Sequence, residues 1–109
     1  MKVTTNDIKG DIVKQDERYT VIDNTTLNGL IVSSTRLVKN QSTTGHSHSG
    51  QEEVYYFITG EGKMDLDDVT YDIKSGDIVL IPAGAFHRVH AAEQGMYFIC
   101  VFDGKRRKK

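Results

Sequence analysis

Three histidines and one glutamate have the residue types and the spacing to bind one divalent metal ion. His46 and His48 lie two residues apart, Glu53 begins the next apolar run, and His87 comes much later. Side chains two positions apart in an extended strand point to the same face, and a short turn brings Glu53 alongside the histidine pair. Three imidazoles and one carboxylate suit a transition metal such as Mn, Fe, Ni or Zn better than calcium or magnesium, which prefer all-oxygen shells.

A second segment, from Gly76 to His87, has proline and glycine where a strand is expected to end in a turn. Its apolar run ends at Pro82, which cannot donate a hydrogen bond to a sheet, and Gly84 follows. Glycine accepts the backbone conformations of a sharp reversal, and Gly60 is expected to serve the same purpose after the first metal-binding segment. The spacing therefore predicts that His87 begins a new strand.

The elements that must position these residues are short strands separated by turns. One helical turn is expected within Asn6–Gln15, and Gly60-Glu61-Gly62 is expected to reverse the chain. The predicted strands are Tyr19–Asp23, Leu30–Lys39, Glu53–Thr59, Lys63–Leu66, Val69–Ile73, Ile78–Ile81, Phe86–His90 and Met96–Phe102. Such a pattern is typical of an antiparallel sandwich or barrel. We expect one domain over residues 1–104, followed by a solvated basic tail, residues 105–109.

The composition is that of a globular domain. The chain has 109 residues, 38% of them hydrophobic, and a formal net charge of −1, so nothing directs it globally to nucleic acid or a membrane. No apolar run approaches the roughly 18 residues of a membrane-spanning helix, and the first residues lack a signal-peptide core. Cys100 is the single cysteine and lies in an apolar run, so we expect it to be buried. A cytoplasmic location is expected.

The two segments together resemble the paired motifs of the cupin superfamily, in particular its small single-domain members labelled mannose-6-phosphate-isomerase-like. The first motif is glycine, five residues, His-x-His, three or four residues, glutamate, six residues, glycine. The second is glycine, five residues, Pro-x-Gly, two residues, histidine, three residues, asparagine. The matching positions are His46, His48, Glu53 and Gly60 for the first motif, and Gly76, Pro82, Gly84 and His87 for the second.

Two positions depart from the motifs. Asn40 stands where the first motif opens with glycine, and Ala91 stands where the second closes with asparagine. Asparagine tolerates a left-handed backbone better than other non-glycine residues, so we expect the turn to survive, and Ala91 removes no metal ligand. The resemblance covers Asn40–Ala91, about half of the chain. It implies an all-β double-stranded β-helix, a jelly-roll-like antiparallel barrel with the metal inside one mouth. It also implies a homodimer formed through sheet edges or strand exchange, with Thr4–Asn24 as the expected contributor.

Several other residues are candidates for the cavity. Tyr55 shares the face of Glu53 by two-residue alternation, and it either presents its phenol as a hydrogen-bond donor or proton carrier or simply packs in the core. His90, three residues after His87, is expected to face solvent or to support a ligand rather than to bind metal. Four further side chains either line the cavity or simply fill the barrel: Met64, Phe86, Phe98 and Cys100.

A metal with four protein ligands keeps two open positions for a bidentate oxygen ligand of a small substrate. Three neutral histidines and one carboxylate leave about one net positive charge, which favours an anionic or enolate-like ligand. Three functions fit this chemistry: a metal-dependent isomerase, epimerase or tautomerase of a small sugar or sugar acid; a dioxygenase or oxidative decarboxylase; and a non-catalytic metal or small-ligand binding protein. Without a visible general base beyond Tyr55, the residues alone do not choose among them.

Overall fold

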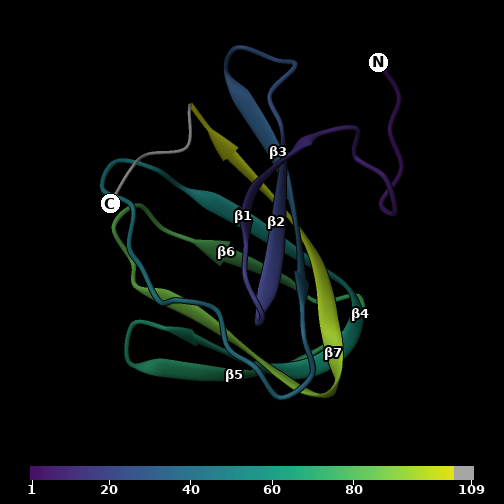
Figure 1. The fold of residues 1–109 in the computed structure, drawn as a ribbon. Coiled ribbons are helices and arrows are strands. Elements are labelled where there is room, and N and C mark those ends of the chain that lie inside the picture. Colours follow the sequence, from purple (N-terminus) through teal and green to yellow (C-terminus); the bar gives the residue numbers. More distant parts are fainter. Residues whose placement is uncertain (105–109) are drawn as a thin grey trace.

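The alternation of apolar and polar residues gives an all-strand fold. The computed structural model describes residues 1–104, and every regular element in this range is a β-strand (Figure 1). The strands are β1 (Asp11–Gln15), β2 (Tyr19–Asn24), β3 (Leu30–Leu37), β4 (Glu53–Leu66), β5 (Val69–Lys74), β6 (Ile78–Ile81) and β7 (His87–Asp103). Within the described range, no helix has the length and hydrophobicity that crossing a membrane requires.

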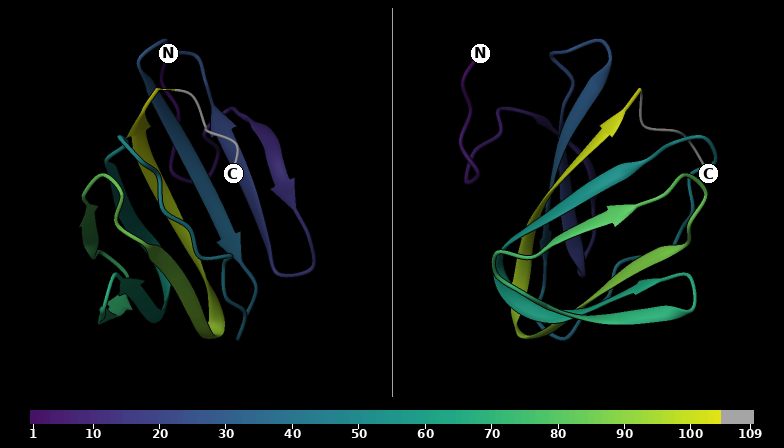
Figure 2. Two further views of the ribbon diagram at one scale, coloured as in Figure 1. Left: turned by 90° about the vertical axis from the view of Figure 1, so that its left-hand side faces the viewer. Right: turned by 180° about the vertical axis from the view of Figure 1, so that it is seen from behind.

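All strand pairs are antiparallel, in the order β1-β2-β3-β7-β4-β5, and β6 pairs with β4. The first half of β4 lies between β6 and the second half of β7, whereas the second half of β4 lies between β5 and the first half of β7. Because β4 and β7 both bend midway, one continuous sheet folds into two facing layers (Figure 2). This confirms the predicted all-β, jelly-roll-like barrel.

The predicted reversal at Gly60-Glu61-Gly62 is wrong, because these residues lie inside β4. The pairing of β4 with β7 shifts register between Phe57 and Thr59 and again between Gly60 and Gly62. Gly60 has φ +90°, and a Cβ there would lie 2.0 Å from the carbonyl oxygen of Gly95. The glycines therefore permit a bulged bend and a close approach of two strands, rather than a turn. The two strands predicted within residues 86–102 likewise form a single strand, β7.

The helical turn predicted within Asn6–Gln15 is also wrong. Residues Asp11–Gln15 form β1, which pairs with β2 at the edge of the sheet. All five residues of β1 are exposed, so this strand has no buried face and its sequence lacks the two-residue alternation that reveals a strand. Its extended conformation depends on pairing with β2, and no pattern within residues 11–15 indicates that pairing.

The core lies between the two layers and is built around aromatic rings. Phe57 is fully buried, and its ring centroid lies 5.1 Å from that of Phe98, which stacks in turn on Tyr55 at 5.3 Å. Met64, Phe98 and Cys100 are buried as predicted. Phe86 was predicted to line the cavity, but it is 41% exposed, because it lies in the turn before β7 rather than in the strand.

The turn that opens the first motif has the predicted conformation. Asn40 has φ +59°, in the left-handed region that asparagine tolerates, and its amide donates to the carbonyl of Ala92 at 3.0 Å. The tight hairpin between β4 and β5 includes Asp67, with φ +52°. The predicted basic tail, residues 105–109, lies outside the described residues.

Candidate metal centre

The four predicted ligands come together at one place in the fold. Each offers one ligand atom, and these atoms all lie within 4.8 Å of one another in the group His46, His48, Glu53 and His87. Donors bound to one metal at about 2.1 Å are about 3 Å apart when adjacent and about 4.2 Å apart when opposite. A contraction of a few tenths of an ångström would therefore bring the group to metal-binding distances.

His46 is positioned by backbone pairing with the start of β7. Its amide donates to the carbonyl of His87 at 3.2 Å, and the amide of His87 donates back to the carbonyl of His46 at 2.9 Å. Residues 41–46, which we call the strap, run beside β7, and a further backbone bond joins Thr43 to Val89 at 2.9 Å. This pairing sets the two imidazole rings edge to face, with centroids 4.6 Å apart.

His48 is held by the loop that leads into β4. Its carbonyl accepts hydrogen bonds from the amides of Gly84 at 2.9 Å and Gln51 at 3.3 Å. The Gln51 side chain is only 2% exposed and donates to the carbonyl of Asp103 at 2.7 Å, which ties the loop to the end of β7. Gly84 belongs to the second motif, so this bond explains how the two motifs reach one site.

Glu53 lies at the point where three strands meet. It is the first residue of β4 and pairs with Ile81 of β6 and Phe102 of β7. Its Oε1 atom lies 3.4 Å from Nε2 of His48 and 3.6 Å from Nε2 of His87, and its side chain is 5% exposed. A buried carboxylate is costly unless positive charge or hydrogen bonds compensate it, and a bound cation would supply that compensation.

The ring of His87 is oriented for ligation through Nε2. Its Nδ1 atom lies 3.1 Å from the carbonyl oxygen of Ala85, an acceptor that requires a proton on Nδ1. In the neutral imidazole this leaves the lone pair on Nε2, the atom that faces Glu53. The donor chemistry of the group therefore fits a divalent transition metal.

Tyr55 lies against this group from the core side. Its ring is edge to face with that of His87, with centroids 5.6 Å apart, and it is 7% exposed. The predicted shared face with Glu53 is therefore present, since both side chains are buried on the inner side of β4. Stacking on Phe98 also makes Tyr55 part of the core, so its role in chemistry stays a prediction.

A hydrogen-bonded chain anchors the strap, and sequence reasoning found only its central member, His90, which it expected to face solvent or to support a ligand. The hydroxyl of Ser42 lies 2.6 Å from Nδ1 of His90, and Nε2 of the same ring lies 2.7 Å from a carboxylate oxygen of Asp65. The bond to His90 lowers the pKa of the Asp65 carboxyl below its usual value, and the hydroxyl of Thr70 adds to this effect. His90 lies outside the four-residue group, and it fixes the strap that carries His46.

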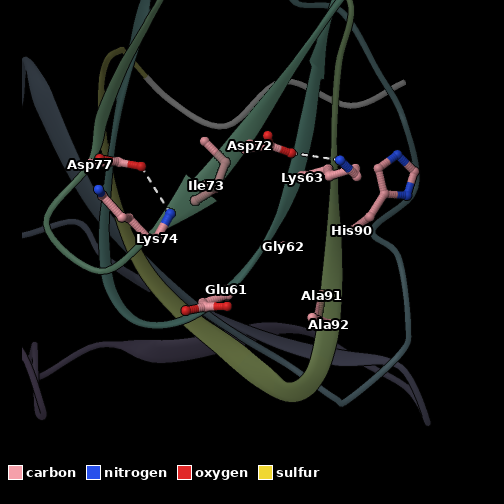
Figure 3. A pocket seen from close by; sticks show the side chains of 10 residues that line it. All are labelled: Glu61, Gly62, Lys63, Asp72, Ile73, Lys74, Asp77, His90, Ala91 and Ala92. Atoms are coloured by element: carbon pink, nitrogen blue, oxygen red, sulfur yellow. Dashed lines mark hydrogen bonds and ion pairs between the residues drawn. The ribbon is translucent and has the colours of Figure 1, made fainter.

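A cleft of about 540 Å³ lies beside this chain, bordered by His90 and by charged side chains of β4 and β5 (Figure 3). The ammonium of Lys63 bonds a carboxylate oxygen of Asp72 at 2.6 Å, and the carboxylate of Asp77 accepts the amide of Lys74 at 2.9 Å. None of the four candidate metal ligands lines this cleft, so its charges are separate from the metal centre.

The chain is similar in sequence to one protein family and to parts of several known proteins. A family model described as "Cupin domain" matches residues 34–102. Acireductone dioxygenase 1 of Vitis vinifera is 40% identical over 50 residues, covering 41% of this chain and 26% of that protein. The matched segments span between 26% and 59% of the lengths of the curated relatives.

Two solved structures illustrate the likeness in fold. KdgF from a Halomonas species superposes with a TM-score of 0.80 at 17% identity, over 92% of this chain and 93% of that chain. Oxalate decarboxylase of Bacillus subtilis, a protein with Mn(II) centres, superposes with a TM-score of 0.80 at 21% identity, over 92% of this chain and 29% of that one. At these identities the likeness concerns the fold.

Proposed function

The chain belongs to the cupin family, and from this premise we propose that it is an enzyme whose divalent metal acts on a small oxygenated substrate. The proposed ligands are His46, His48, Glu53 and His87. The observation that carries the proposal is their convergence from three separate segments, with the Glu53 carboxylate within 3.6 Å of two imidazole nitrogens. When bound, the metal would act as a Lewis acid that polarises a carbonyl of the substrate.

The protein groups contribute orientation and charge. The carbonyl of Ala85 keeps the Nε2 atom of His87 available for ligation, and the strap keeps His46 opposite it. Glu53 supplies one negative charge, which balances half of the charge of a divalent cation. The remaining positive charge would attract an anionic oxygen of the substrate. The three buried ligands exclude water from one side of the site, which strengthens these interactions.

We assign the reaction first to isomerisation, epimerisation or tautomerisation of a small sugar or sugar acid. Tyr55 supports this choice, because its ring is edge to face with that of His87, with centroids 5.6 Å apart, and its hydroxyl bears a proton. Its phenol would hold the proton that moves between neighbouring substrate atoms. A second candidate is a dioxygenase or oxidative decarboxylase, favoured by the 40% identity over 50 residues with a plant acireductone dioxygenase.

Proton exchange separates the two candidates. Protein loaded with manganese is incubated anaerobically in deuterated water with a panel of ketoses and keto acids, and carbon-bound deuterium is measured by nuclear magnetic resonance. Exchange that Tyr55→Phe abolishes, with metal content unchanged, supports the isomerase. Tyr56→Phe is the matched control, because Tyr56 lies on the outer face of the same strand and is 42% exposed. Oxygen uptake in a parallel aerobic incubation, without exchange in the anaerobic one, would instead support the dioxygenase.

We propose further that the protein acts as a homodimer in the cytoplasm. Sequence reasoning placed the dimer contact in Thr4–Asn24. The exposed edge strand β1 within that range supports pairing through an edge, because its outer side is open for further hydrogen bonds. Gel filtration with light scattering tests the oligomeric state.

A further inference from the structure

The hydrogen-bonded chain that anchors the strap contains a serine, a histidine and an aspartate, and none of them belongs to the candidate metal centre. Ser42 lies on the strap, His90 on β7 and Asp65 on β4, so three segments of the chain bring them together. The serine hydroxyl lies 2.6 Å from Nδ1 of His90, and Nε2 of the same ring lies 2.7 Å from a carboxylate oxygen of Asp65. This order, from hydroxyl to imidazole to carboxylate, is that of the nucleophilic triad of serine hydrolases.

The partners of the two ring nitrogens select the tautomer of His90 that can activate a hydroxyl. The carboxylate of Asp65 only accepts hydrogen bonds, so Nε2 carries the proton of the neutral ring. Nδ1 then keeps its lone pair, which accepts the hydroxyl proton of Ser42. In serine hydrolases the two nitrogens have the opposite roles, but the proton moves in the same direction, from hydroxyl to imidazole.

The carboxylate at the far end of the chain is ionised and fixed in place. Thr70 donates a hydrogen bond to the second carboxylate oxygen of Asp65 at 2.8 Å. The bond from His90, followed by the bond from Thr70, lowers the pKa of the Asp65 carboxyl below its usual value. Asp65 therefore holds the orientation of the His90 ring and would stabilise the imidazolium that forms when the ring takes a proton.

Small molecules can reach this chain from solvent. The side chains of His90 and Asp65 are 33% and 28% exposed, and Ser42 is half-buried. His90 also stands at the right-hand side of the cleft shown in Figure 3. The volume of this cleft, about 540 Å³, lies in the range of about 300–1,000 Å³ that is usual for small-molecule sites. The cleft therefore offers room for the part of a substrate that does not react.

Hydrogen-bond donors lie where negative charge would form during attack by the serine. Ser42 and His90 are opposite each other in an antiparallel bridge, and the backbone bonds of this bridge are made by the residues before and after them. The amide of Ser42 consequently points away from β7. Arg18 lies on that side, with Nη1 3.5 Å from the carbonyl oxygen of Ser42. The amide of a nucleophilic serine is one of the two donors that stabilise the oxyanion in serine hydrolases, and Arg18 would supply the second donor here.

We propose that Ser42 is a nucleophile for acyl transfer and that the substrate is a small carboxylic ester. This activity goes beyond the proposed metal-dependent function and requires no metal. The Oγ atom of Ser42 forms a bond to the ester carbonyl carbon while its proton passes to Nδ1 of His90. The carbonyl oxygen becomes the oxyanion, which the Ser42 amide and Arg18 stabilise.

Collapse of this intermediate completes the transfer. The bond between the carbonyl carbon and the alcohol oxygen breaks, and His90 gives its proton to the departing alcohol. Water then attacks the acyl-serine, again with His90 as the base. The carboxylic acid leaves, and the proton returns from His90 to the Ser42 hydroxyl. No oxidant, reductant or further reactant is needed.

Covalent labelling in the presence of EDTA tests the nucleophile while the metal centre is empty. The full chain is incubated with a fluorophosphonate, which reacts with activated serine hydroxyls, and the labelled peptide is identified by mass spectrometry. We expect about one adduct per chain, on Ser42, in wild type. Ser49→Ala is the matched control, because Ser49 is an exposed serine, and it should label as wild type does. Ser42→Ala should not label.

Two substitutions separate an activated serine from a merely exposed one. His90→Gln removes the base and should slow labelling about 100-fold or more, and Asp65→Asn should slow it about tenfold or more. Circular dichroism melting confirms that each variant is folded. Trapping of an acetyl group on Ser42 after acid quenching of wild type with p-nitrophenyl acetate provides a check without any substitution.

The proposal is overturned if wild type carries no adduct, if both reagents modify a residue other than Ser42, or if folded His90→Gln labels at the wild-type rate. Each of these results leaves the metal-dependent function untouched, because all labelling is done without metal. Conversely, a protein that binds no manganese but labels on Ser42 would refute the metal centre and support the nucleophile.

Discussion

Replacing Glu53 by glutamine separates the stability of the fold from the binding of metal. The Glu53 carboxylate is 5% exposed and lies 3.4 Å and 3.6 Å from two imidazole nitrogens. Burying a charge without full compensation costs free energy, and glutamine keeps the shape of the side chain without the charge. In the absence of metal, we therefore expect Glu53→Gln to lower the free energy of unfolding by no more than about 1 kcal/mol.

With metal, the same substitution should have a large effect. A metal at 100 times its dissociation constant adds about 2.7 kcal/mol to the free energy of unfolding of a protein that binds it only when folded. One kcal/mol shifts the melting temperature of a domain of this size by about 4–8 °C, so wild type should melt about 10–20 °C higher when metal is added. Glu53→Gln loses one of four ligands and the negative charge that balances the cation, so this shift should fall below about 5 °C.

The assay is thermal unfolding by circular dichroism in EDTA and at one fixed free manganese concentration. Glu52→Gln is the matched control, because it removes the same charge from the adjacent residue, which is exposed. It should keep the full metal-dependent shift. A Glu53→Gln protein that melts with the wild-type shift would show that the carboxylate is not a ligand. A metal-free variant destabilised by several kcal/mol would show that Glu53 serves the fold.

Three further predictions concern the elements that support the site. Gly60→Ala should destabilise the protein by about 3 kcal/mol or more in guanidinium unfolding, since its Cβ would lie 2.0 Å from a backbone oxygen, whereas Gly50→Ala, with φ +71° and open space, should cost about 1 kcal/mol. Ser42→Ala should weaken manganese affinity about threefold to tenfold in calorimetry through loss of its bond to His90, and the exposed Ser49→Ala should not. The pKa of Asp16 is lowered from 3.8 to about 2, chiefly by the backbone amide and the guanidinium of Arg18. Its carboxylate therefore stabilises the folded protein at pH values above the unfolded pKa, and this stability is lost as the pH falls from about 5 to below 2. Asp16→Asn should flatten the dependence of stability on pH in this range, and an unchanged slope would contradict that assignment.

The sequence was sufficient to predict that the four candidate ligands lie together, because the motifs that contain them are local to two short segments. The two-residue alternation placed Tyr55 on the inner face with Glu53, and the structure confirms its burial. The spacing of Pro82 and Gly84 before His87 predicted the start of a strand, and β7 begins at His87. Residue types and short spacings determine these features, so a single sequence reveals them.

Features that depend on distant pairing could not be read in the same way. Glycine permits both a reversal and a bulge, so Gly60 does not distinguish a turn from the bend inside β4. The edge strand β1 has no buried face and hence no apolar alternation. The bond between Ser42 and His90 joins residues 48 positions apart, and no pattern within either segment indicates it.

The most direct test of the metal centre is the metal content of the purified protein. Wild type is equilibrated with manganese, freed of excess metal by gel filtration, and analysed by mass spectrometry beside His87→Ala and His90→Ala. We expect about one metal ion per chain in wild type, somewhat less in His90→Ala, whose altered residue lies outside the ligand group but fixes the strap, and less than about a tenth in His87→Ala. Equal metal content in wild type and His87→Ala, or none in wild type, would contradict the proposal that these four side chains hold one ion.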